Sequence, residues 1–286
     1  MPAPERVLVT TMSNPRLPPE ILDHIVDHLH DTQDALRNCC LLSKSWVQRT
    51  RKRLFANVAL SSVASLRSWK ETFPDPSTSP ARYAQTLYIS CAHVVTAADA
   101  ESGGWIRGFS RVEHLEVVGL GESFLRTSSY LAPFHGFSPV IKSLRVVVLT
   151  LPPSPIINLI LSFPLLEDLA VSIYHEMSAD NGDGSECDEI LTTAQPSTSP
   201  MFTGSLGLYL VGGLESFTRR LLSLPGGIHF RKLTLTLLRE DDFLTATALV
   251  EGCSHTLESL DILDACGMSV RYLRPHLQLT IVCRAP

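Results

Sequence analysis

The chain has 286 residues, of which 44% are hydrophobic and 19% are charged, and its formal net charge is −5 at pH 7. This composition is typical of a globular protein and excludes an intrinsically disordered chain. A mildly acidic protein also gives no reason to expect nucleic-acid binding by the chain as a whole. The length allows one large domain, or a small domain followed by a larger one.

Residues 1–15 contain only a three-residue apolar run, which is too short for a signal peptide, and we expect a flexible N-terminus there. The seven cysteines include no C-x-x-C pair, so neither a zinc knuckle nor a redox motif is indicated. We therefore expect a reducing compartment, the cytoplasm or the nucleus. The most apolar stretch, 146–166, contains four prolines and is not a transmembrane helix.

Three short amphipathic helices are predicted within residues 17–55. Prolines 18 and 19 suit the first turn of the first helix, since proline lacks only an N–H that would be unpaired there. Its apolar stripe is Ile21, Leu22, Ile25, Val26 and Leu29. The apolar side of the second helix is Ala35, Leu36, Cys39, Cys40 and Leu42. The apolar side of the third helix is Trp46, Val47, Thr50, Leu54 and Phe55. Helices this short are not stable alone and must pack together.

These residues also match a family pattern. The start Leu-Pro-x-Glu-Ile/Leu-Leu is present as LPPEIL at 17–22, aliphatic residues follow at Ile25 and Leu29, and a basic stretch ends in Leu54-Phe55. Residues 16–60 resemble an F-box. One departure is Leu-Ser-Lys at 42–44, where the family usually has Val-Cys followed by Lys or Arg before its tryptophan region.

The resemblance implies two partners and a division of labour. F-box proteins dock this module on a Skp-family adaptor within cullin–RING ubiquitin ligases, and a C-terminal region selects the target protein. By the same resemblance, the adaptor-binding residues are Leu17, Pro18, Ile21, Leu22, Ile25, Leu29, Leu36 and Trp46.

Two clusters in this region suggest other functions. His24 and His28 have the i, i+4 spacing of a metal pair, but no third and fourth ligands follow in a recognisable pattern. We interpret them as part of a solvated face on the side away from the apolar stripe, and we expect no metal or other cofactor. The basic run 49–53 suits nucleic acid, although an exposed face of the third helix explains it more simply.

A linker is expected at 61–83, where three prolines interrupt the sequence KETFPDPSTSPAR. The segment PSTSP occurs at 76–80 and again at 196–200, and Ser79 and Ser199 each precede a proline. Phosphorylation of these serines is one interpretation, and a flexible linker is the simpler one.

The rest of the chain, 84–286, repeats a short phrase with a central leucine. The central leucines are Leu87, Leu115, Leu144, Leu169, Leu206, Leu233 and Leu260, with separations of 28, 29, 25, 37, 27 and 27 residues. The longest interval holds an acidic loop insert at 176–200. A period in this range indicates a repeat architecture.

Each phrase alternates apolar and other residues as a strand does, and helix-like segments lie at 155–164, 214–225 and 242–254. This alternation predicts an α/β fold: an irregular, leucine-rich-repeat-like solenoid with a parallel sheet and helices on its other face. The region resembles leucine-rich repeats but lacks their asparagine or cysteine. A final strand at 277–282 is expected to cap it.

If the leucines point inward, the alternate strand positions face outward. We expect this face to bind the target through Tyr88, Arg145, Tyr174, Tyr209, Thr234 and Thr236, and it also includes Glu116 and Asp261. Tyrosine is common in binding surfaces because it combines contact area with a polar tip. Exposed strand positions are also rich in Thr and Tyr through β propensity alone.

No nucleophile motif, P-loop or dinucleotide fingerprint occurs in the sequence, so we expect no enzymatic activity. The resemblance to an F-box implies a substrate-recognition subunit of an SCF-type ubiquitin ligase. Two alternatives stay open: a repeat scaffold unconnected with ubiquitin, and a nucleic-acid-binding protein that uses residues 44–53.

Overall fold

The computed structural model divides the chain into two compact units, Met1–Leu54 and Phe55–Pro286. It describes residues 18–29, 32–42, 44–90, 103–120, 134, 137, 139–148, 153–173, 202–210, 214–224, 226–237, 242–264, 268–273 and 278–283. Several predictions lie outside these residues: the N-terminus 1–15, Leu17, Tyr174, the insert 176–200 and Ser199.

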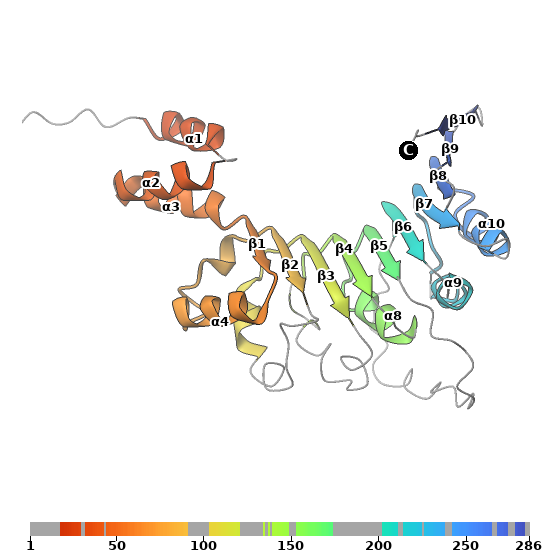
Figure 1. The fold of residues 1–286 in the computed structure, drawn as a ribbon, viewed down its shortest axis with the longest axis horizontal. Coiled ribbons are helices and arrows are strands. Elements are labelled where there is room, and N and C mark those ends of the chain that lie inside the picture. Colours follow the sequence, from red (N-terminus) through yellow and green to blue (C-terminus); the bar gives the residue numbers. More distant parts are fainter. Residues whose placement is uncertain are drawn as a thin grey trace, which may run out of the picture. The chain divides into compact units, whose positions relative to one another are not determined.

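The described residues of the first unit form three helices, as predicted: α1 (Pro19–His28), α2 (Gln33–Leu42) and α3 (Lys44–Leu54) (Figure 1). Both α1 and α2 pack on α3. Leu22, Val26, Leu36 and Cys39 supply its small apolar core.

The second unit is built on one ten-stranded sheet in which the strands follow one another in sequence order. The strands are β1 (Asn57–Leu60), β2 (Thr86–Ser90), β3 (His114–Leu120), β4 (Ser143–Val148), β5 (Asp168–Ile173), β6 (Ser205–Leu210), β7 (Lys232–Leu237), β8 (Ser259–Asp264), β9 (Met268–Leu273) and β10 (Gln278–Cys283). Strands β1–β8 are parallel, which confirms the predicted α/β class with a parallel sheet.

The seven repeated leucines lie side by side in the sheet. Each central leucine pairs with the next, from Leu87 on β2 to Leu260 on β8. A second row, two residues further along each strand, runs Ile89, Val117, Val146, Val171, Leu208, Leu235 and Ile262. Both rows face the core, because side chains two residues apart share one face of a strand.

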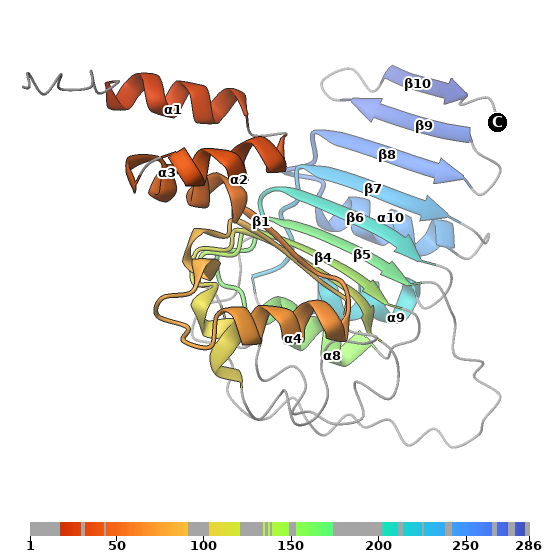
Figure 2. The same cartoon turned by 60° about the vertical axis from the view of Figure 1, so that its left-hand side comes forward.

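Helices α4 (Val63–Thr72), α8 (Pro153–Leu161), α9 (Leu214–Leu222) and α10 (Asp242–Gly252) lie on one face of this sheet (Figures 1 and 2). The three helices predicted after residue 150 correspond to α8, α9 and α10. The same unit contains two short 3-10 helices, η1 (Pro80–Tyr83) and η2 (Gly103–Gly108). The opposite face of the sheet carries no described helix of this unit.

The expected linker at 61–83 is instead folded structure. Helix α4 begins at a capping box in which Ser62 and Ser65 each bond the other's backbone N–H. Its Trp69 stacks on the buried Phe109 at a centroid distance of 5.4 Å. The prolines lie after the helix, in a turn and at the start of η1, so they end α4 without preventing it.

The structure differs from two further expectations. Residues 57–60, assigned to the F-box, form β1, because Val58 and Leu60 extend the two apolar rows of the sheet. The C-terminal strand β10 exists, but it pairs antiparallel with β9, which is itself antiparallel to β8. The connections from β8 to β9 and from β9 to β10 are only a few residues long, too short for the crossover that a parallel pair needs.

Candidate protein-docking surfaces

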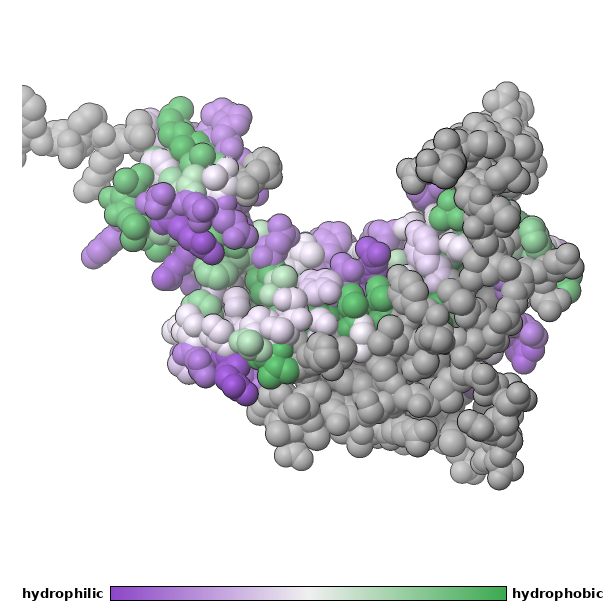
Figure 3. Space-filling model, viewed as in Figure 1, coloured by the Kyte–Doolittle hydropathy of each residue, from purple (hydrophilic) through white to green (hydrophobic). Residues whose placement is uncertain are grey.

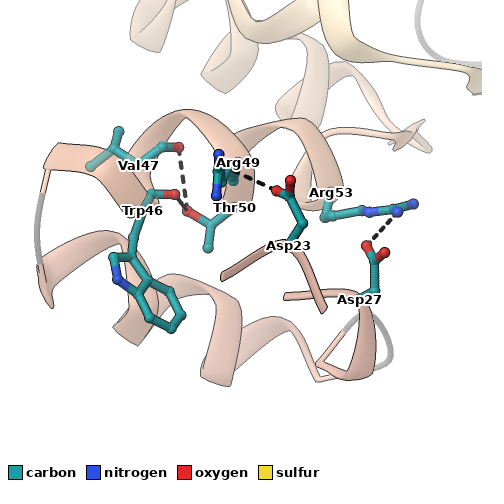
Figure 4. Close-up of polar contacts among 7 residues, drawn as sticks. All are labelled: Asp23, Asp27, Trp46, Val47, Arg49, Thr50 and Arg53. Atoms are coloured by element: carbon teal, nitrogen blue, oxygen red, sulfur yellow. Dashed lines mark hydrogen bonds and ion pairs between the residues drawn. The ribbon is translucent and has the colours of Figure 1, made fainter. Parts of the chain in front are cut away.

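Two ion pairs join α1 to α3 in the first unit (Figure 4). Arg49 Nε lies 3.2 Å from Asp23 Oδ1, and the Arg53 guanidinium contacts Asp27 one turn further along. Most of these side chains are about half exposed, so each pair contributes at most about 1 kcal/mol. The pairs fix the register of the two helices more than they stabilise them.

Thr50 is the fully buried polar residue of this unit's described core. Its hydroxyl donates to the Trp46 carbonyl oxygen at 2.7 Å (Figure 4). The same hydroxyl lies 2.9 Å from the Cys40 sulfur and so links α3 to α2. This contact satisfies the hydroxyl inside the bundle, as a buried polar group requires.

The predicted adaptor-binding residues fall into three environments. Leu22 and Leu36 are buried in the bundle, 7% and 1% exposed, so they hold the helices together. Ile25, Leu29 and Trp46 are half-buried, and Pro18 is exposed. Among the described residues of the predicted set, Ile21 is the one large hydrophobic that is exposed, at 46%.

Two residues that sequence reasoning did not assign to this surface are Leu41 and Leu42, which are 84% and 68% exposed. Leu42 was expected on the apolar side of its helix, and that expectation is wrong. The contacts of α2 with α3 bury Leu36 and Cys39 instead, and Leu42, the last residue of α2, lies beyond them. Figure 3 shows the resulting hydrophobic side chains on the surface of the first unit, over α1 and the end of α2.

The two histidines of α1 are exposed, and their Nε2 atoms lie 3.1 Å apart. They were expected on the side away from the apolar stripe. Because the bundle buries Leu22 and Val26, the other edge of the stripe is open, and Ile21, His24 and His28 share it at i, i+3 and i+7 spacing. Within the described part of the chain, no group of three or more His, Cys, Asp and Glu side chains is arranged to hold a metal ion.

The basic run at 49–53 is partly neutralised. Arg49 and Arg53 face carboxylates of α1, while Arg51 and Lys52 are exposed on the same helix. A nucleic-acid contact draws on free cations, so the pairing weighs against the nucleic-acid alternative.

The helix-free face of the sheet places the predicted target-binding residues in rows. Tyr88, Glu116 and Arg145 are register partners on β2, β3 and β4, and Arg145 contacts Glu116 at 3.6 Å. Tyr209 and Thr236 pair on β6 and β7. Arg145 and Tyr209 are exposed, and Tyr88, Thr234 and Thr236 are half-buried.

Asp261 departs from the expectation that it faces solvent, since it is only 6% exposed. Its carboxylate lies 3.7 Å from the Lys232 ammonium on the neighbouring strand. The longer lysine side chain reaches water while the aspartate stays at the sheet surface.

Small residues lie at the middle of this face, where Ala170 on β5 pairs with Gly207 on β6. The Tyr209 ring leans over Gly207, and a methyl group added to Gly207 would lie 3.1 Å from the ring edge. Glycine therefore lets the exposed tyrosine lie close to the sheet, next to its register partner Thr236.

None of the described helices combines the length and the apolar character that crossing a membrane requires. No protein-family model matches the chain. A search of curated proteins finds no relative of it.

Proposed function

We propose that this protein is the substrate-recognition subunit of an SCF-type cullin–RING ubiquitin ligase, with no catalytic residues of its own. The observation that carries the proposal is the exposure of Ile21, Leu41 and Leu42 on a unit of three short helices that precedes a large sheet domain. Exposed hydrophobic side chains that gather on one surface mark protein-interaction sites.

A Skp-family adaptor is the partner proposed for this surface. Burial of one leucine or isoleucine side chain contributes about 1.5–3 kcal/mol, and every ~1.4 kcal/mol changes a dissociation constant tenfold. Loss of one such contact is therefore expected to weaken binding about tenfold or more. The F-box pattern at 17–55 supplies the expectation that the adaptor, rather than another protein, binds here.

The second unit is proposed as a leucine-rich-repeat-like solenoid that binds the target protein. Support comes from the in-register leucine row and from the helices gathered on one face of the sheet. The target would contact the opposite face, where Arg145 and Tyr209 are exposed. A repeat scaffold unconnected with ubiquitin would share this second unit but not the adaptor.

The test is a calorimetric titration of the full chain with a purified Skp-family adaptor. We expect Ile21→Asp and Leu41→Asp each to weaken binding well over tenfold, because each places a charge in a desolvated contact. Leu244→Asp is the matched control, since Leu244 is 78% exposed on α10 of the other unit.

Circular dichroism must show unchanged helix content in all three variants. Failure of the wild-type chain to bind the adaptor would overturn the proposal and favour the scaffold alternative. Full affinity in both aspartate variants would show that the adaptor docks elsewhere.

A further inference from the structure

His24 and His28 form a convergent pair that the proposed ligase function does not use. Their Nε2 atoms are 3.1 Å apart, their ring centroids are 4.4 Å apart, and the rings are inclined at 76°. Both side chains are exposed on α1, so an ion can reach them from solvent.

The separation of the two nitrogens suits a shared transition-metal ion. An imidazole nitrogen binds zinc at about 2.0–2.1 Å. Two nitrogens 3.1 Å apart at that bond length subtend roughly 100° at the ion. This angle lies between the values of tetrahedral and octahedral coordination, so neither imidazole has to move far.

The surroundings leave the pair available. Asp23 and Asp27, the nearest carboxylates along the helix, are engaged by Arg49 and Arg53 of α3. The same distance also fits a hydrogen bond between the two rings. A metal ion displaces that bond without disturbing the packing of Leu22 and Val26 on the buried side.

We propose that His24 and His28 together bind a divalent transition-metal ion such as Zn²⁺ or Ni²⁺ through their Nε2 atoms. Neutral imidazole is a good ligand for these ions and a poor one for Mg²⁺ or Ca²⁺, which prefer oxygen. Water completes the coordination in the isolated chain. The bound ion links two successive turns of α1 and so stabilises a helix that is too short to be stable alone.

Calorimetric titration of the full, reduced chain with Ni²⁺ and then Zn²⁺ tests the site. We expect His24→Ala and His28→Ala each to lower the affinity at least tenfold, and the double variant to add little, because a chelate needs both rings. His255→Ala removes another exposed histidine and should leave the affinity unchanged. Mg²⁺ at the same concentration should not bind.

Nuclear magnetic resonance gives a second readout that locates the ion. The imidazole resonances of His24 and His28 should shift together on addition of one equivalent of Zn²⁺. Absence of binding in the wild type, equal affinity in the single variants, or shifts confined to cysteines and other histidines would each overturn the proposal. None of these results depends on whether the adaptor binds.

Discussion

Gly204 lies where the chain re-enters the sheet after the long segment between β5 and β6. Asp168 Oδ1 accepts hydrogen bonds from the Ser205 N–H and hydroxyl, each at 2.7 Å, and so fastens the first residue of β6 to the first residue of β5. A side chain on Gly204 would overlap that carboxylate oxygen and lie 2.9 Å from the Glu167 carbonyl oxygen. The absence of a side chain is therefore required for this register.

Gly204→Ala should lower the free energy of unfolding by about 1–3 kcal/mol, the usual cost of overpacking. Urea unfolding measures the loss. In an Asp168→Ala background the added methyl group should cost less unfolding free energy, because the Asp168 carboxylate oxygen that it would overlap is absent. An identical cost in both backgrounds would contradict the assigned contact.

Cys253 is a free thiol, only 1% exposed, that directly follows α10. Burial raises the pKa of this thiol above its ordinary value, and a hydrogen bond with the Phe230 backbone opposes the shift. The folded protein therefore keeps the thiol protonated at a pH where the unfolded chain ionises it. Its contribution to stability is complete below the unfolded pKa and is lost as pH rises through the folded pKa.

The stability advantage of the wild type over Cys253→Ala should therefore narrow between pH 7 and pH 10. Urea unfolding of both proteins at the two pH values measures this difference in unfolding free energy. Because both proteins carry the same other titratable groups, the contributions of those groups cancel in the difference. A constant difference would mean that the thiol ionises as freely in the folded state as in the unfolded state.

At the scale of the element, the two apolar rows explain how the strands acquire one register. A slip of one residue would move every leucine of a strand from the core to the other face. The six leucines from Leu87 to Leu233 are at most 2% exposed. Burial of the two apolar side chains of each strand, one from each row, therefore sets its register against the neighbouring strands.

Leu144→Ala, at 0% exposed, should cost about 2–5 kcal/mol of unfolding free energy, since it leaves a cavity in the middle of the row. Leu165→Ala is the matched control: this leucine is 52% exposed just before β5, and its loss should stay within about 0.5 kcal/mol. Thermal and urea unfolding of the two variants measure these losses of unfolding free energy. Comparable losses would contradict the inward orientation of the row.

At the scale of the whole molecule, the division of the chain lies at residues 54 and 55 and not in a linker at 61–83. Strand β1 and helix α4 complete the start of the sheet, and Phe55, Trp69 and Phe73 form an aromatic cluster there. Fragments cut on either side of these elements should therefore behave differently.

A fragment of residues 55–286 should unfold in one cooperative transition. A fragment of residues 84–286 lacks β1 and α4 and so exposes Phe109, which stacks on Trp69. We expect it to melt at a lower temperature and to bind a hydrophobic dye. Equal melting temperatures would show that β1 and α4 are not part of the folded unit.

Sequence alone determined the elements whose signal is local. Period-2 and period-3.6 patterns of apolar residues predicted β2–β8 and the helices α1–α3 and α8–α10, because burying one face requires that spacing. The recurring leucine phrase also predicted a parallel sheet, since strands that alternate with helix-like segments favour parallel order.

Only the tertiary structure decided which apolar residues remain exposed. Leu36 and Leu42 belong to the same helical pattern, yet one is 1% and the other 68% exposed, because burial depends on where α3 lies against α2. The close approach at Gly204 and the antiparallel end of the sheet also depend on tertiary contacts. Each is a relation in space between residues, and spacing along the chain specifies only the faces that such residues occupy.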